Sequence, residues 1–167
     1  MIKELGARGS LYLDPGYMCC LKKPGAIHTV VGACCVVCLW DRTHRYGGMN
    51  HFLYPATSNT LLATPKFGNV ATLGLIKLME EAGSRREDLV AQILGGASPL
   101  DRPHLQLGMK NVQAARDVLE RKHVFITSQD VGGHMGRKII FDTGTGHIMI
   151  LKVHHLRQED WMMHCPG

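Results

Sequence analysis

Two side chains suited to nucleophilic chemistry lie close together in the chain, Cys34 and His51. Cys34 follows Gly32 and Ala33, small residues at which a backbone can turn sharply and present amide N–H groups beside a thiol. A thiol is mostly protonated at neutral pH, so an imidazole must take its proton before it attacks. This pattern predicts an acyl-transfer centre with Cys34 as nucleophile and His51 as base. Spacing alone leaves open that His51 is a buried structural residue.

Six cysteines and ten histidines could also indicate a metal site. Cys35 and Cys38 have CxxC spacing, but side chains three apart on a strand point to opposite faces and cannot hold one ion. Residues 154–155 and 164–165 offer His and Cys ligands only in a terminal tail without fixed geometry. The glycine-rich residues 132–138 lack the glycine and lysine positions of a phosphate loop. We therefore expect neither metal nor organic cofactor.

Composition indicates one soluble domain. The chain has 167 residues, of which 45% are hydrophobic and 20% charged. No apolar run approaches the roughly 20 residues of a membrane span, and the N-terminus has no signal-peptide core, so we expect a cytoplasmic protein without membrane insertion. The net charge is +5, but basic pairs are scattered and only 6% of residues are aromatic, which argues against nucleic-acid binding.

Hydrophobic periodicity predicts strands at both ends of the chain with two helices between them. Residues 27–41 read as a strand, a kink at Gly32 and Ala33, and a second strand. The other expected elements are a turn at 47–48, a strand at 49–54, a helix at 70–82 capped by Asn69 and stopped by Gly83, a strand at 89–94, a helix at 111–122, a strand at 124–127, and a hairpin of 138–141 with 148–153. This order favours an α+β layered sandwich of mixed sheets with two main helices. We expect one domain over residues 1–167, with its core at about 14–153 and a tail at 154–167.

The order of several short motifs resembles the CheD family of chemoreceptor glutamine deamidases. The matching segments are 29–34 (TVVGAC), 37–41 (VCLWD) and 47–52 (GGMNHF), followed by 67–68, 95–97, 108–111 and 130–138. The resemblance extends over about residues 14–153. It implies a cysteine hydrolase, a protein-glutamine glutaminase that converts selected glutamines of methyl-accepting chemotaxis receptors to glutamate and ammonia. It also implies a CheC-type phosphatase as a second partner.

By the same resemblance, the nucleophile maps to Cys34, the base to His51, and the oxyanion turn to Gly32 and Ala33. We expect a thiolate of Cys34 paired with a protonated His51, and a thioester intermediate. Attack on a glutamyl methyl ester would be chemically close. A non-catalytic adaptor that binds receptors or a CheC-type phosphatase is the alternative reading.

The sequence departs from the family pattern at two positions. Ala33 stands where the family usually has Ser, and His28 stands where it has Thr or Ser, six positions before the cysteine. Thr29 is one place further on, and one step along a strand turns a side chain to the other face, so Thr29 would need a bulge to replace the missing hydroxyl. His28 could instead orient His51 or hold the substrate amide.

Overall fold

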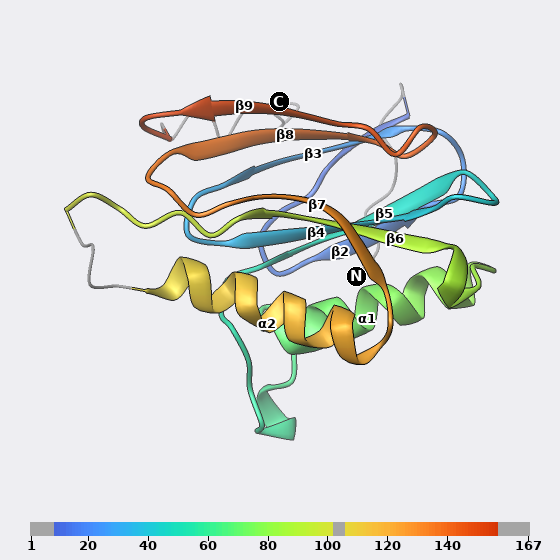
Figure 1. Ribbon diagram of the computed structural model, residues 1–167, viewed down its shortest axis with the longest axis horizontal. Helices are drawn as coiled ribbons and strands as arrows, with labels where there is room; N and C mark the ends of the chain where they lie inside the picture. The colour runs from blue at the N-terminus through green and yellow to red at the C-terminus, as the bar shows by residue number, and fades with distance from the viewer. Residues whose placement is uncertain (1–8, 102–105, 157–167) are drawn as a thin grey trace, which may run out of the picture.

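The computed structural model describes residues 9–101 and 106–156, which form three stacked layers (Figure 1). A four-stranded sheet lies on a five-stranded sheet, and two helices cover the far face of the latter. The four-stranded sheet has the order β1 (Ser10–Tyr12), β3 (Ala26–Val31), β8 (Gly136–Asp142), β9 (Ile148–Val153). The five-stranded sheet has the order β2 (Met18–Leu21), β5 (Tyr46–Phe52), β4 (Cys35–Asp41), β6 (Leu89–Gly95), β7 (Phe125–Val131).

The helical layer consists of α1 (Gly68–Glu81) and α2 (Leu107–Arg121), with short 3-10 turns η1 (Thr60–Leu62) and η2 (Arg86–Asp88). The pairs β1–β3 and β6–β7 are parallel and the other strand pairs are antiparallel, so both sheets are mixed. This architecture confirms the predicted α+β layered sandwich. Within the described residues, neither helix is long and apolar enough to cross a lipid bilayer.

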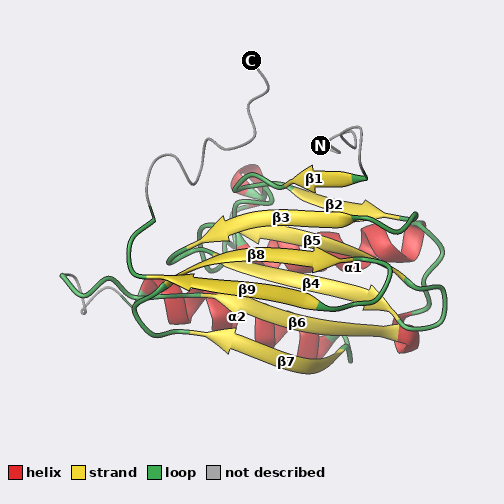
Figure 2. Ribbon diagram, turned by 90° about the horizontal axis from the view of Figure 1, so that it is seen from above, coloured by secondary structure: helices red, strands yellow, loops and turns green. Residues whose placement is uncertain are grey.

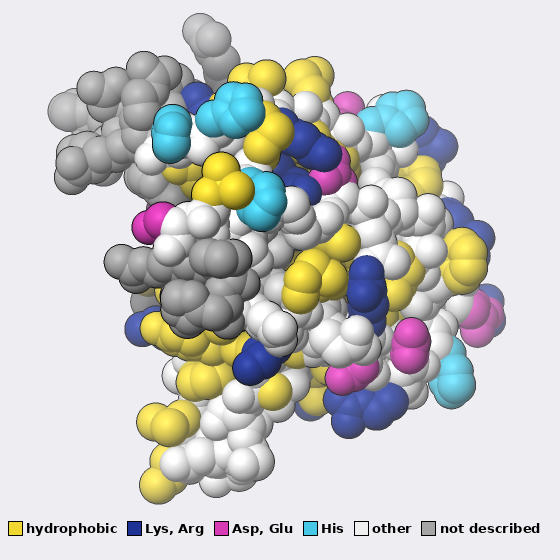
Figure 3. Space-filling view, turned by 60° about the vertical axis from the view of Figure 1, so that its left-hand side comes forward, with side chains coloured by type: hydrophobic (Ala, Val, Ile, Leu, Met, Phe, Trp, Pro, Cys, Tyr) yellow, Lys and Arg dark blue, Asp and Glu magenta, His cyan; other side chains and the backbone are white. Residues whose placement is uncertain are grey.

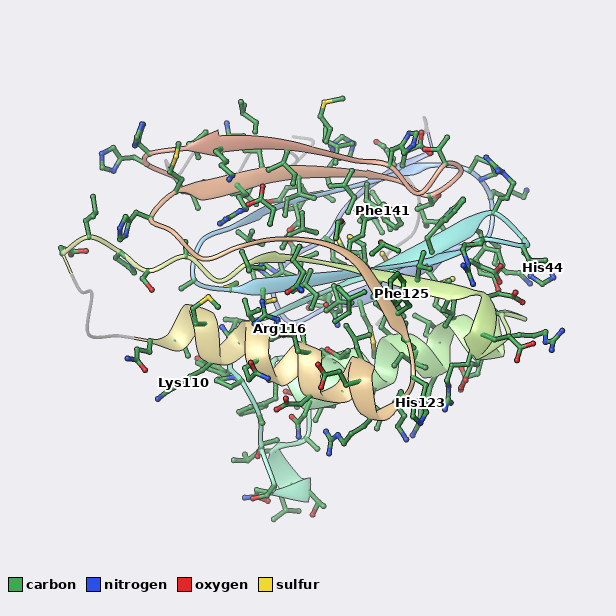
Figure 4. The ribbon with its side chains drawn as sticks, viewed as in Figure 1. His44, Lys110, Arg116, His123, Phe125 and Phe141 are labelled. Atoms are coloured by element: carbon green, nitrogen blue, oxygen red, sulfur yellow. The ribbon has the colours of Figure 1, made fainter. Side chains whose placement is uncertain are left out.

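Two hydrophobic cores fill the spaces between the three layers, and β4 contributes side chains to both. Cys35 and Val37 pack toward the helices, whereas Val36 and Cys38 pack into the space between the sheets. Phe141 from β8 fills that second core (Figure 4). The predicted opposite orientation of Cys35 and Cys38 is therefore confirmed.

The strand, kink and strand expected over residues 27–41 are present as β3 and β4, which belong to different sheets. Their connection lies at one end of the molecule, beside the start of α2 and the β7–β8 turn (Figure 1, left; Figure 2). The predicted hairpin of β8 and β9 and the strand ending at Gly95 are also confirmed. The short strands β1 and β2 were not predicted.

Gly47 and Gly48 do not form the predicted turn, because both lie inside β5. A Cβ on Gly47 would lie 2.8 Å from the Leu39 carbonyl oxygen, and one on Gly48 would lie 2.6 Å from the Cys19 carbonyl oxygen. These glycines let neighbouring strands approach closely. The chain reverses before them, near Arg45, whose φ is 57°.

We expect Gly48→Ala to lower the free energy of unfolding by about 2 kcal/mol, because the added methyl meets backbone that cannot move aside. Gly74→Ala in α1 is the matched control: its Cβ meets only the flexible end of Met18, and alanine favours a helix. Urea denaturation measures both variants. Equal stability of the two would contradict the close-approach explanation.

Both helices begin before their predicted starts. Phe67 is the N-cap of α1, and Asn69 lies inside the helix instead of capping it. The Asn69 side chain accepts a hydrogen bond from the Thr57 N–H and donates one to the Thr57 carbonyl, and so ties down the preceding loop. α2 begins at Leu107 instead of 111. Of the predicted tail, residues 157–167 lie outside the described residues.

Candidate active site

A buried hydrogen bond joins the two sheets at His51. The Thr29 hydroxyl oxygen on β3 lies 2.8 Å from His51 Nδ1 on β5, and both side chains are almost wholly buried. Thr29 also donates its hydroxyl hydrogen to the Leu13 carbonyl oxygen, at 2.8 Å. Because the hydroxyl has a single hydrogen, it must accept from His51 Nδ1–H. This arrangement fixes the imidazole tautomer with the proton on Nδ1.

The other ring nitrogen, His51 Nε2, is therefore unprotonated and free to act as a base. It is buried and has no hydrogen-bond partner among the described residues. A buried acceptor without a partner is costly in a structural role, and such groups are rare away from functional sites. Such a geometry, in which a neighbour orients one ring nitrogen and leaves the other unprotonated, is suited to a general base.

Strand register brings the Cys34 segment to the end of β5 that carries His51. Val36 is opposite His51 in the β4–β5 pair, and Cys34 directly precedes β4. The backbone of Cys34 therefore lies at the same end of the five-stranded sheet as His51. Cys34 is only partly buried, whereas Cys35 and Cys38 are buried.

The carbonyl groups of Gly32 and Cys34 are hydrogen-bonded to the residues that follow β6. The Gly32 carbonyl accepts from the Ala97 N–H at 3.0 Å, and the Cys34 carbonyl accepts from the Gly96 N–H at 2.8 Å. No oxygen atom of the described residues accepts a hydrogen bond from the N–H of Ala33 or Cys34. These amides are suited to bind a developing oxyanion.

Burial shifts the pKa values of both groups toward their neutral forms. Desolvation raises the pKa of the Cys34 thiol, with a smaller opposing effect from its own backbone N–H. Desolvation lowers the pKa of His51 to about 4, only partly offset by the Leu13 carbonyl and the charge of Asp14. The thiolate and imidazolium pair expected from the sequence stays a prediction, and these shifts oppose it. Both shifts favour a neutral thiol and a neutral imidazole in the free protein.

This pKa predicts an acid limit of activity well below that of an ordinary histidine. At pH 5 a histidine with a pKa near 6.5 is mostly protonated, whereas His51 with a pKa of about 4 stays neutral. We expect kcat/KM of a reaction in which His51 is the base to stay nearly constant from pH 7 down to about pH 5. A fall in kcat/KM centred near pH 6.5 would contradict the assignment of His51 as the base.

Folding stability must be followed in the same experiment. The pKa of His51 is lower in the folded than in the unfolded protein, so the unfolded chain binds more protons between pH 6.5 and about 4. Stability therefore falls as the pH drops through this window. Rates are compared only where circular dichroism shows a folded protein.

The structure corrects the sequence argument about residues 28 and 29. Thr29, not His28, contacts His51, and the pairing of β3 with β8 continues through both residues without a register shift. Ile27, Thr29 and Val31 face the space between the sheets, while His28 lies on the opposite face of β3. Thr29 therefore reaches His51 without a β-bulge. The six-residue spacing between His28 and Cys34 includes the turn at Gly32, so it does not determine which face of β3 a side chain lies on.

A cavity of about 460 Å³ adjoins the turn at Gly32 and Ala33. Three histidines, His134, His154 and His155, line it. Figure 3 shows the surface of the molecule with histidine side chains coloured cyan. No group of three or more His, Cys, Asp or Glu side chains suited to a metal occurs in residues 9–101 and 106–156. Residues 164–165, which were considered as tail ligands and set aside, lie outside that range.

The glycine-rich residues 132–138 have a structural function. Arg137 is buried and donates to Asp130 Oδ1 at 2.8 Å from Nη2, to the Gly132 carbonyl and to the Met135 carbonyl. Lys152 adds a second cation 3.1 Å from the same carboxylate oxygen. These contacts lower the pKa of Asp130 against the opposing effect of burial and hold the β7–β8 turn at the rim of the cavity.

Comparison with known proteins decides the family. A family profile described as "CheD chemotactic sensory transduction" matches residues 55–152. The chain belongs to the CheD family. A CheD of Sulfurimonas denitrificans is 39% identical over 142 residues, covering 83% of this chain and 91% of that protein. A CheD of Trichlorobacter lovleyi is 40% identical over 138 residues (76% and 86%), and a CheD of Anaeromyxobacter dehalogenans is 41% identical over 143 residues (84% and 83%).

These CheD relatives are named probable chemoreceptor glutamine deamidases. The family profile begins after His51, so the Thr29–His51 geometry is an observation separate from that match. Sequence reasoning did not single out Asn111, whose amide contacts the Ala33 and Leu53 carbonyls. The segment 108–111 contributed to the family resemblance, but only the fold shows what this residue touches.

Proposed function

We propose that this protein is a chemoreceptor glutamine deamidase, with Cys34 as nucleophile and His51 as general base. The observation that supports it best is the Thr29–His51 hydrogen bond, which leaves His51 Nε2 unprotonated and, among the residues that the structure describes, without a partner. The names of the CheD relatives supply the substrate class. The site residues supply the chemistry.

The reaction begins when Cys34 attacks the side-chain carboxamide carbon of a glutamine. His51 Nε2 takes the thiol proton as the C–S bond forms. The carbonyl oxygen becomes an oxyanion that accepts from the Ala33 and Cys34 N–H groups. The imidazolium then protonates the leaving –NH2, the C–N bond breaks, and ammonia departs to leave a thioester.

Hydrolysis completes the cycle. His51 takes a proton from water as the water oxygen attacks the thioester carbon. When the C–S bond breaks, His51 returns that proton to the Cys34 sulfur, and the product is glutamate. Each step uses side chains, backbone amides and water.

We propose that the receptor helix lies across the end of the molecule that bears the cavity. The glutamine side chain would enter beside Ala33, where the cavity adjoins the turn. The net charge of +5 suits docking to an acidic helix. The five free cysteines among the described residues are consistent with the reducing cytoplasm as the location.

We also propose that a CheC-type phosphatase binds the same end of the molecule. The family resemblance supports this partner, and a shared surface would make the two partners compete. Adding such a phosphatase should then slow ammonia release from a receptor fragment. Undiminished release at saturating phosphatase would count against a shared surface.

The direct test is ammonia release from a purified receptor cytoplasmic fragment. We expect release with the wild-type protein and none above background when His51 is replaced by Gln, which removes the base. A protein that binds the fragment but releases no ammonia would instead support the adaptor reading.

A further inference from the structure

Asn111 is a fully buried amide in the helix that packs under the active site. It lies on the buried face of α2 among Gly108, Val112 and Ala115. An amide in such an apolar stripe is costly unless it is hydrogen-bonded. Its position therefore indicates a specific structural or functional role.

The Asn111 side chain links the segments that hold the two proposed catalytic groups. Its Nδ2 donates to the Ala33 carbonyl at 2.9 Å and to the Leu53 carbonyl at 3.0 Å. Because both partners are carbonyl oxygens, the group that faces them must be the NH2 and not the amide oxygen. Ala33 directly precedes Cys34, and Leu53 follows His51 by two residues.

The bond to Ala33 fixes the direction of the Cys34 N–H. The Ala33 carbonyl and the Cys34 N–H belong to one planar trans peptide, so they point in opposite directions. Holding the carbonyl against Asn111 therefore turns the Cys34 N–H away from α2. The bond from Ala97 to the Gly32 carbonyl orients the Ala33 N–H in the same way.

Two glycines bring Asn111 within reach of the turn. A Cβ on Gly108 would lie 2.3 Å from the Gly96 carbonyl oxygen, and one on Gly96 would lie 2.7 Å from the Gly108 carbonyl oxygen. α2 thus packs directly against the bend that follows β6. This contact places Asn111, one helical turn further on, beneath the Ala33–Cys34 peptide.

We propose that Asn111 is a positioning residue for the oxyanion site, which it sets by holding the Ala33–Cys34 peptide in one orientation. The inference rests on the proposed deamidase function. Asn111 touches neither the substrate nor Cys34 Sγ in this account. Its effect is on the transition state, where the oxyanion develops, and not on the reactivity of the thiol.

The test uses Asn111→Asp and Asn111→Ala, with Gln113→Ala on the exposed side of α2 as control. Aspartate has the same shape but presents an oxygen to the two carbonyls. We expect kcat for ammonia release to fall about 30-fold in both Asn111 variants, with KM changed less than about 2-fold. The alkylation rate of Cys34 by iodoacetamide, read by peptide mass spectrometry, should stay near the wild-type rate.

An unchanged kcat in both variants would overturn the inference. So would an alkylation rate that falls as far as kcat, because it would mean a damaged Cys34–His51 pair. A loss of kcat that matches the unfolded fraction seen by circular dichroism would also overturn it, since the role would then be structural.

A measurement without substrate separates this inference from the proposed function. In nitrogen-15 NMR spectra of the free protein, Asn111→Asp should shift the amide signal of Cys34 strongly, and Gln113→Ala should not. An unmoved Cys34 signal would contradict the inference even if the wild-type protein deamidates receptors. Absence of ammonia release by the wild-type protein would contradict the function alone.

Discussion

Replacing Cys34 with alanine should reduce ammonia release from a receptor fragment by about 10⁴-fold or more, because the only proposed nucleophile is lost. The variant should fold normally, since the Cys34 side chain is only partly buried and alanine fits at its position. The measurement is single-turnover ammonia release, combined with thermal unfolding to verify the fold.

Cys35→Ala is the matched control for this variant. Cys35 is wholly buried on the helix side of β4, and burial raises the pKa of its thiol far above the ordinary range. We expect this variant to lose some stability but to keep activity near that of the wild type. Activity in Cys34→Ala together with inactivity in folded Cys35→Ala would assign the nucleophile to the neighbouring residue.

Replacing Thr29 with valine should lower kcat about 100-fold, because the isosteric side chain no longer holds the proton on His51 Nδ1. Without that acceptor the ring can turn or change tautomer, and Nε2 ceases to be the fixed base. Steady-state ammonia release measures the effect. Thr29→Ser keeps the hydroxyl and should recover most of the activity.

His28→Ala tests the competing assignment on the opposite face of β3. We expect less than about a 3-fold change in kcat, because its side chain does not face the space between the sheets where His51 lies. A large loss of kcat in folded His28→Ala, with full activity in Thr29→Val, would reverse the assignment of these two residues.

The hydrophobic periodicity of the sequence is sufficient to predict many of the helices and strands. The β-branched run interrupted at Gly32 and Ala33 predicted β3, the turn and β4, because strands and kinks leave local signals. The three-to-four spacing of apolar residues likewise predicted α1. Gly47 and Gly48 misled the prediction, since a glycine required for close strand packing looks like a turn glycine until the neighbouring strand is known.

The active site was less predictable than the strands. Residue type and spacing, together with the resemblance to the CheD family, predict Cys34 and His51 as the catalytic pair. The partner of His51 depends on which face of β3 meets the other sheet. Counting back from Cys34 favoured His28, whereas the packing of Thr29 between the sheets decides the contact. Asn111 is separated from Ala33 by 78 residues, and no local pattern predicts a contact across that distance.

The most direct test of the account is mass spectrometry of a receptor cytoplasmic fragment after incubation with the wild-type protein. We expect defined glutamines to become glutamates, so that each modified peptide carries an –OH in place of an –NH2 and is heavier by that difference. A parallel incubation with Cys34→Ala should leave the same peptides unchanged. A fragment that binds the wild-type protein yet shows no altered glutamine would contradict the deamidase assignment.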